Sequence, residues 1–365
     1  MRVLFIDVEE PFPPDQGDRI RGYRLVEALS TLGHRVTLAT RNPRHHRAWQ
    51  ALGVTPLPLA PGPARYRPDL PLSARIQSAR LAPPSGAWEL ALGHGWPALP
   101  LLQATDADRR ILDLTDALGL FRQRARALLP PIRRLRLDLL TLGVERAEAS
   151  PPALVDEVWV SGASDLHWLV RRNPRWRDSL RLVPNGTAPA QREFYGPGPG
   201  GLYTVGNFHY PPNREGIVRF LREAWPRLRS RVPDLTLDVV GAGSRSLPAA
   251  AGLRRLGYLA DPSPVIRSAR ALLVPVRFGA GTRGKILEAW AHGKPVISTL
   301  AGAEGLPREP APTMLLGETL EELAELVAAV HGDPERLLEL GRNGFAAARA
   351  LDWSELIARA LGRRP

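Results

Sequence analysis

The sequence predicts an α/β protein with two doubly wound domains. Two observations lead to this prediction. Short runs rich in Val, Ile and Leu alternate with helical patterns, and a Pro/Gly-rich segment, 192–201, divides the alternation into two series. Strands that alternate with helices form parallel sheets with crossover helices. A chain of 365 residues with 44% hydrophobic side chains is long enough to bury two such cores.

The first series begins with a strand and a helical pattern over 19–33. Each later run is also short, apolar and rich in β-branched residues, as expected for a buried parallel strand. The predicted strands of this series are 2–8, 34–40, 88–93, 109–115, 156–162 and 180–186.

The second series begins after 192–201, where the composition favours turns. A helix is expected over 213–231, another over 282–292, and a closing helical segment over about 333–362. The predicted strands of this series are 201–207, 235–241, 253–259, 269–276 and 293–299.

These patterns predict the domain organisation of the chain. We expect a first domain over 1–190, a second over 191–345, and a C-terminal helical segment over 346–365. Trp353, in that last segment, is expected to pack back onto the first domain. Ligands of open α/β sheets bind at the carboxyl ends of the strands, so a site is expected there in each domain.

Composition excludes several classes of chemistry. The chain has no cysteine, which removes disulfides, thiolate metal sites and cysteine nucleophiles. The apolar run at the N-terminus is too short for a secretory signal and no stretch approaches a membrane span, so a soluble cytoplasmic protein is expected. No nucleic-acid-binding motif is found. The formal net charge of +12 leaves phosphorylated substrates and anionic membranes as candidate partners.

The densest arginine cluster lies in RQRARALLPPIRRLRLD, residues 122–138. We expect one long amphipathic helix here, with leucines and Ile132 on its apolar side. The simpler interpretation is a solvated basic face opposite a buried apolar face. Docking of a basic face on an anionic membrane is the alternative.

Residues 278–298, FGAGTRGKILEAWAHGKPVIS, contain the only two lysines among 49 basic residues. A glycine loop here precedes the helix predicted over 282–292. Lys285 and Glu288 are three positions apart and share one face of that helix. Backbone N–H groups at a helix start, together with the charges of Arg283 and Lys285, would form a phosphate cradle. A surface ion pair between Lys285 and Glu288 is the bland alternative, but both lysines within one glycine-rich string favour the cradle.

These segments carry a resemblance to a known family. GAGTRGKILEAWAHGKPVISTLAGAEGL (279–306) resembles the donor site of family 4-type glycosyltransferases of the GT-B fold. The resemblance extends through YTVGNFHYPPNREGIVRFLREAWP (203–226) and VVGAGS (239–244). PFPPDQGDRIRGYRLVEAL (11–29) is similar to the subgroup found with bacterial exopolysaccharide and exosortase systems.

The resemblance implies two Rossmann-like domains facing a cleft, with the C-terminal helix returning to the first, acceptor-side domain. It implies a retaining, metal-independent hexosyltransferase that moves a sugar from a nucleotide-sugar to a glycan or lipid-linked acceptor, beside a membrane and without a cofactor. The residues it assigns as catalytic are Arg283, Lys285, Glu288 and His94, the last on the acceptor side. The residues it assigns to the donor are Gly17, Asp18, Arg21, Gly206, Asn207, Tyr258, Leu259, Gly279, Gly281, Thr282, Arg283, Lys285 and Glu288.

One position departs from the family pattern. The motif has a first glutamate eight residues before Glu288, where this chain has Ala280. The departure leaves open a nucleotide-sugar epimerase or an inverting transferase on the same scaffold, or a non-catalytic nucleotide-sugar-binding protein. It also affects how the sugar hydroxyls are held.

Several other polar residues have structural explanations. Helix capping explains Asp116 as well as chemistry does. Asp7 and Glu9 fit strand alternation and capping. His94 fits a helix start as well as it fits an acceptor site, and His45 and His46 lack the further ligands of a metal site.

Overall fold

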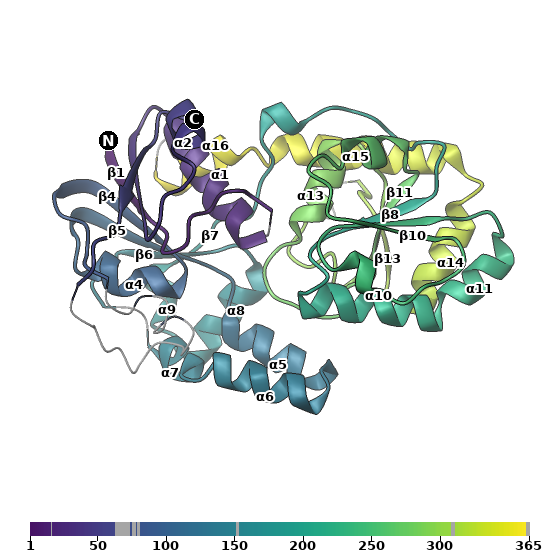
Figure 1. Cartoon of the computed structure of the whole chain (residues 1–365), viewed down its shortest axis with the longest axis horizontal. Helices are drawn as coiled ribbons and strands as arrows, with labels where there is room; N and C mark the ends of the chain where they lie inside the picture. The colour runs from purple at the N-terminus through teal and green to yellow at the C-terminus, as the bar shows by residue number, and fades with distance from the viewer. Residues whose placement is uncertain are drawn as a thin grey trace. The chain divides into compact units, whose positions relative to one another are not determined.

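A computed structural model of the chain describes residues 1–15, 17–62, 74, 78, 81–150, 153–307 and 311–362. The chain divides into two compact units (Figure 1). Unit 1 contains Met1–Pro184 and Trp353–Pro365, and unit 2 contains Asn185–Asp352. The sequence placed the corresponding boundaries after residues 190 and 345.

Unit 1 is a parallel sheet of seven strands in the order β3-β2-β1-β4-β5-β6-β7. All six strands predicted from the sequence are present, and β3 is an additional strand at one edge. Two prolines in β3 weaken its apolar pattern, which explains why it was missed. The strands are β1 Arg2–Ile6, β2 Arg35–Thr40, β3 Thr55–Pro58, β4 Ala87–His94, β5 Asp106–Thr115, β6 Glu157–Val160 and β7 Leu180–Leu182.

Helices cover both faces of this sheet, because one buried apolar cluster lies on each face. One cluster includes Leu25, Trp49 and Trp353, and the other includes Leu99 and Leu169. The helices are α1 Gly17–Thr31, α2 His46–Ala51, α4 Gly95–Gln103, α5 Leu118–Leu128, α6 Pro131–Leu140, α7 Val144–Ala149, α8 Ala163–Arg172, α9 Trp176–Ser179 and α16 Trp353–Ala360.

Unit 2 is a parallel sheet of six strands in the order β10-β9-β8-β11-β12-β13. The five predicted strands are present, and the short edge strand β13 was not predicted. The strands are β8 Leu202–Val205, β9 Leu237–Val240, β10 Leu253–Gly257, β11 Ala271–Val274, β12 Val296–Thr299 and β13 Leu315–Gly317.

In unit 2, α13 and α15 cover one face of the sheet, and α10, α11 and α14 cover the other (Figure 1). The Pro/Gly-rich segment 192–201 belongs to this unit, since Tyr195 N–H donates to His292 O and Gly198 N–H donates to Ala269 O. The helices are α10 Pro211–Glu223, α11 Trp225–Arg231, α12 Ser263–Ser268, α13 Gly284–Ala291, α14 Leu320–Val330 and α15 Pro334–Ala350.

Two helices predicted as continuous are each broken at a proline, and the closing segment expected over about 333–362 divides into α15 and α16. The helix expected over 122–138 divides into α5 and α6 at Pro130. The helix expected over 213–231 divides into α10 and α11 just before Pro226. Proline lacks a backbone N–H and its ring clashes with the carbonyl four residues earlier in a helix, so both interruptions follow from local chemistry.

Candidate functional site

The predicted donor residues of unit 2 lie at the carboxyl ends of two adjacent strands. β8 pairs with β11 in the middle of the sheet, where the strand order reverses direction. The loop 206–210 leaves β8, and the loop 275–283 leaves β11. Such a reversal opens a crevice between neighbouring loops, and ligands of open α/β sheets bind there.

The loop after β11 leads directly into α13. Gly279 and Gly281 have φ angles of +153° and +67°, which residues with a side chain rarely adopt. Arg283 is the N-cap of α13 and makes no side-chain capping hydrogen bond. Ile286, Leu287 and Trp290 are buried, as the helical pattern predicted. The positive end of the α13 dipole therefore faces the loop without a side-chain acceptor at its cap.

Lys285 connects α13 to the loop after β8. Its Nζ donates to Asn213 Oδ1 at 2.8 Å, and Asn213 Nδ2 donates to Asn207 O at 2.9 Å. A Cβ added to Gly206 would lie 3.0 Å from Lys285 Nζ, so the lysine lies directly against that glycine. Burial, reinforced by the charge of Arg283, lowers the pKa of Lys285 to about 7.

Arg283 folds back over the glycine loop. Its Nη1 donates to Ala280 O at 2.6 Å, at the position where the family motif has its first glutamate. Its Nε and Nη2 are buried and have no hydrogen-bond partner within the described part of the chain. A Cβ at Gly279 would lie 2.1 Å from Nη2, so a side chain at this position would displace the guanidinium. Buried donors that lack a partner indicate a place for an acceptor.

Two further residues of the predicted site adjoin this cluster. Glu288 lies one turn along α13 from Lys285. Burial and the negative charge of Glu288 raise the pKa of Tyr203, in β8, well above its usual value. Thr282 Oγ1 accepts a hydrogen bond from Asn185 Nδ2 at 2.8 Å. The structure thus brings together Gly206, Asn207, Gly279, Gly281, Thr282, Arg283, Lys285 and Glu288.

Other residues of the same segments lie apart from the cluster. Tyr258 and Leu259 follow β10, two strands from β8, and Tyr258 is 60% exposed. Lys294, the second lysine of the segment, is buried, and its Nζ donates to Arg267 O at 2.9 Å and Ala269 O at 2.8 Å. The ammonium of Lys294 therefore satisfies main-chain carbonyls.

Unit 1 has a buried ionic cluster at the carboxyl ends of β4 and β5. Arg21 donates to Asp113 through Nε at 2.9 Å and Nη2 at 2.7 Å. His94 lies between two carboxylates, with Nδ1 2.8 Å from Asp113 Oδ2 and Nε2 3.1 Å from Asp18 Oδ1. Arg21, His94 and Asp113 are buried, whereas the Asp18 side chain is 76% exposed. His94 and Asp18 thus form the solvent side of the cluster.

The cluster shifts the pKa of each buried member. Burial would raise the pKa of Asp113, but Arg21 and the His94 hydrogen bond lower it to about 2. Burial opposes the charge on His94, yet Asp18 and Asp113 raise its pKa well above the usual range. Burial raises the pKa of Asp7 to about 7. The two carboxylates therefore favour the charged form of His94.

The structure corrects some details predicted around this cluster. Gly17, which the resemblance assigns to the donor, is the first residue of α1. Asp116 was predicted to cap the helix that begins near it. In the structure, carboxylates from two other helices bond to N–H groups at the start of α5: Asp165 accepts the N–H of Ala117, and Glu148 accepts the N–H of Gly119. These two carboxylates belong to α7 and α8, which the local sequence around Asp116 could not reveal.

Sequence reasoning also missed residues that the structure brings into the two clusters. Asn213 was not singled out as a site residue, although it is the first residue of the helix predicted over 213–231 and follows a predicted loop. Asp7 was assigned to strand alternation, yet it lies against the His94 cluster: a Cβ on Gly22 would be 3.0 Å from Asp7 Oδ2 and 3.3 Å from His94 Cδ2. Residues separated by up to about 90 positions meet only through the sheet order.

The described residues lack both a metal-binding cluster and a membrane-spanning helix. No group of three or more His, Asp and Glu side chains there is arranged to hold a metal ion. None of the helices described is both long and apolar enough to cross a membrane.

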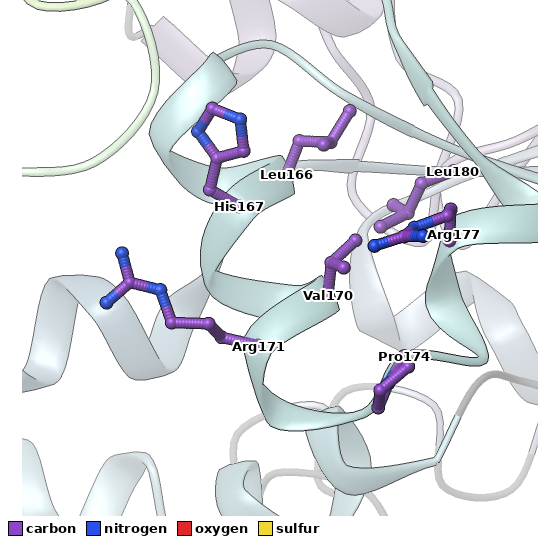
Figure 2. Close-up of a pocket in the computed structure, with 7 residues that line it drawn as sticks. All are labelled: Leu166, His167, Val170, Arg171, Pro174, Arg177 and Leu180. Atoms are coloured by element: carbon purple, nitrogen blue, oxygen red, sulfur yellow. The ribbon is translucent and has the colours of Figure 1, made fainter.

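A pocket of about 780 Å³ lies elsewhere on unit 1 (Figure 2). It is formed by α8, α9 and the start of β7, and none of the predicted site residues contributes to it. Its lining residues are Leu166, His167, Val170, Arg171, Pro174, Arg177 and Leu180.

Most of unit 2 lies within a segment that matches a known protein family. Residues 200–358 match the family described as Glycosyl transferases group 1. No protein of curated function matches the sequence.

Solved structures are similar to this chain over nearly its whole length. They include Anabaena Alr3699/HepE in complex with UDP and glucose, at 14% identity, with 99% of each chain covered and a TM-score of 0.67. Sucrose-phosphate synthase from Thermosynechococcus elongatus has 19% identity, 99% and 97% coverage and a TM-score of 0.68. WaaG, a glycosyltransferase involved in lipopolysaccharide biosynthesis, has 14% identity, 98% coverage of both chains and a TM-score of 0.67. The chain therefore has the α/β fold of GT-B glycosyltransferase structures, and its residues 200–358 are similar to the Glycosyl transferases group 1 family.

Proposed function

We propose that this protein is a retaining, metal-independent hexosyltransferase of the family 4 type. In the proposed reaction a sugar passes from a nucleotide-sugar to a glycan or lipid-linked acceptor of bacterial polysaccharide biosynthesis, such as an exopolysaccharide. This transfer reaction is proposed to take place at the inner face of the plasma membrane. The group 1 match and the similarity to HepE, whose structure holds UDP and glucose, support the donor class.

The observation that carries the proposal is the pair of cations beside α13. Lys285 and Arg283 lie close enough for the guanidinium to lower the pKa of the ammonium. Arg283 also has two buried N–H donors without a partner among the described residues. A helix N-terminus lies at the same place. Two like charges and a helix dipole at one point favour a bound anion with several oxygens, and a diphosphate has that chemistry.

The proposed mechanism follows from charge. When the bond between the anomeric carbon and the phosphate oxygen breaks, the diphosphate gains negative charge. Lys285, Arg283 and the α13 dipole stabilise that charge in a partly buried site, where electrostatic interactions are stronger than in water. Retention requires the acceptor hydroxyl to approach the face that the diphosphate leaves.

Other residues have proposed roles in holding the two substrates. Glu288 accepts hydrogen bonds from the ribose hydroxyls, as the second glutamate of the family motif. Ala280 cannot accept hydrogen bonds from the sugar hydroxyls that a first glutamate would bind. The Arg283 guanidinium, which lies beside Ala280, is the polar group proposed to contact these hydroxyls. Tyr258 and Leu259 are proposed to contact the base. On the acceptor side, Asp113 fixes Nδ1 of His94 and leaves Nε2 directed toward the exposed Asp18.

A thermal-shift panel of nucleoside diphosphates and nucleotide-sugars tests the donor assignment. A nucleotide at 100 times its dissociation constant should stabilise the fold by about 2.7 kcal/mol. The double variant Arg283→Met with Lys285→Met should lose this stabilisation, while its Tm without ligand should stay close to that of the wild-type protein. Absence of any shift in the wild-type protein would contradict the proposal.

Three further measurements separate the finer parts of the proposal. Donor hydrolysis or transfer distinguishes an enzyme from a non-catalytic binding protein. The anomeric configuration of the product, observed by NMR, distinguishes retention from inversion. Activity that persists after dialysis against EDTA is expected, and loss of activity restored by a divalent ion would refute metal independence.

A further inference from the structure

Helix α6 presents its apolar side chains to solvent. It contains no buried residue. Ile132, Leu135 and Leu139 are three and four positions apart, so they form one stripe along the helix. They are 75%, 57% and 54% exposed. We call these three residues the apolar stripe of α6.

Polar side chains of α6 contact the rest of unit 1. Asp138 accepts a hydrogen bond from Arg122 Nε at 2.9 Å and pairs with Arg126, and both arginines belong to α5. Arg134 Nε donates to Leu129 O at 2.5 Å. A surface helix normally buries its apolar side and exposes its charged side. The arginines of α6 are exposed, as expected, but the apolar stripe is exposed as well and only Leu137 and Asp138 are half-buried. The buried apolar face expected for this helix is therefore not observed.

The break at Pro130 explains how this arrangement arises. It lets α6 turn back and lie beside α5 at the edge of unit 1 (Figure 1). The chain just after α6 continues the apolar surface, because Leu142 is 56% exposed. Arg133 and Arg136 are exposed on the same helix. The result is a projecting element with an apolar stripe and flanking cations.

We propose that α6 docks on an anionic lipid bilayer and lies in the plane of its interface. The apolar stripe of α6 inserts at the boundary of the acyl chains, and Arg133 and Arg136 meet the headgroup phosphates. Helices with apolar residues on one side and arginines beside them bind membrane surfaces in this way. Each basic residue near an anionic leaflet strengthens the attraction.

Charge favours a bilayer over a second copy of the chain as the occupant. Two α6 helices joined through their stripes would bring the flanking arginines of both copies together, and like charges oppose that contact. The formal net charge of +12 acts in the same sense. An anionic bilayer, in contrast, accepts the stripe and the arginines together.

The inference adds a membrane-binding surface to the proposed function, and it rests on that function only where it concerns the lipid-linked acceptor. Vesicle binding needs no substrate, so the two can fail separately. If donor hydrolysis is absent while vesicle binding holds, the proposed function fails and the docking surface stands.

Co-sedimentation with vesicles tests the surface. The wild-type protein should bind vesicles of equal phosphatidylglycerol and phosphatidylcholine at least tenfold more tightly than pure phosphatidylcholine vesicles. The triple variant Ile132→Ser, Leu135→Ser and Leu139→Ser should lose tenfold or more of this binding, with an unchanged Tm because these side chains are exposed. Leu182→Ser with Leu300→Ser, which changes exposed leucines elsewhere, should stay within twofold of wild type.

A second pair of variants tests the charge. Arg133→Ser with Arg136→Ser should weaken binding to the anionic vesicles by about tenfold or more. Arg342→Ser with Arg349→Ser removes the same charge from α15 and should have less than twofold effect. Equal binding by the triple variant and wild type would overturn the proposal. A dimer seen by sedimentation equilibrium without vesicles, and lost in the triple variant, would overturn it too by making α6 a self-contact.

Discussion

At the scale of single residues, the two lysines of the chain make different kinds of contact, although only nine positions separate them. Lys285 is held by one side-chain acceptor beside a helix start, whereas Lys294 satisfies two main-chain carbonyls in the interior. The sequence indicated that this segment is special and assigned Lys285 to the site, but it gave Lys294 no separate role. Only the packing of Arg267 and Ala269 around Lys294 separates them.

This difference makes the lysines a matched pair for mutation. Lys285→Met should lower the rate of donor turnover about a hundredfold, because removing one group that stabilises transition-state charge costs about 3 kcal/mol. Its Tm should change little. Lys294→Met should lower the free energy of unfolding by about 1–3 kcal/mol, since two buried carbonyls lose their donor, yet leave the rate per folded molecule unchanged. Steady-state kinetics and urea unfolding measure both effects, and the opposite pattern would refute the assignment.

Asp7 should make the stability of the fold depend on pH. Burial raises its pKa to about 7, while the charge of His94 lowers it and the charges of Asp18 and Glu9 raise it. The unfolded chain releases this proton near pH 4 and the folded chain keeps it until about pH 7, so rising pH destabilises the fold over that window.

Asp7→Asn removes this dependence. The variant should be more stable than wild type at pH 8 by roughly 2 kcal/mol or more, and the difference should shrink toward pH 5. Urea unfolding of both proteins across this range measures the difference. A constant difference between pH 5 and pH 8 would show that Asp7 does not titrate in the fold.

At the scale of elements, α16 confirms a prediction from the sequence. Trp353 packs in the core of unit 1, as expected, and the Arg21 guanidinium lies 5.8 Å from the centre of its ring. Arg21 is also the partner of Asp113. The closing helix thus supports the ionic cluster through one aromatic side chain, a connection that the sequence did not show because α1 and α16 are more than 300 positions apart.

Trp353→Ala should destabilise unit 1 by about 3–5 kcal/mol, because a large buried aromatic is removed and Arg21 loses its ring contact. Trp353→Phe keeps an aromatic face and should recover much of that loss. Urea unfolding followed by tryptophan fluorescence compares the two variants. Equal losses for Ala and Phe would show that the ring contact with Arg21 contributes nothing.

At the scale of the whole molecule, alternation of strands and helices predicted both sheets and their parallel strands. It did so because parallel strands must be buried and are therefore apolar, and because βαβ connections need a helix. Edge strands β3 and β13 were missed because short edge strands carry a weaker pattern. In the site, the α13 cluster was predicted from one continuous segment. The ionic cluster of unit 1 was only partly foreseen, since Asp7, Arg21, His94 and Asp113 meet through strand order alone.

The division of unit 1 into two sequence segments has a consequence for synthesis on the ribosome. Unit 2 is continuous in sequence, so it can complete its folding as soon as residue 352 has emerged. The face of α1 that receives Trp353 stays uncovered until the following helix is released, although most of its own unit was translated first. Domains generally fold in the order of translation, but here the later-translated unit can be finished before the earlier one.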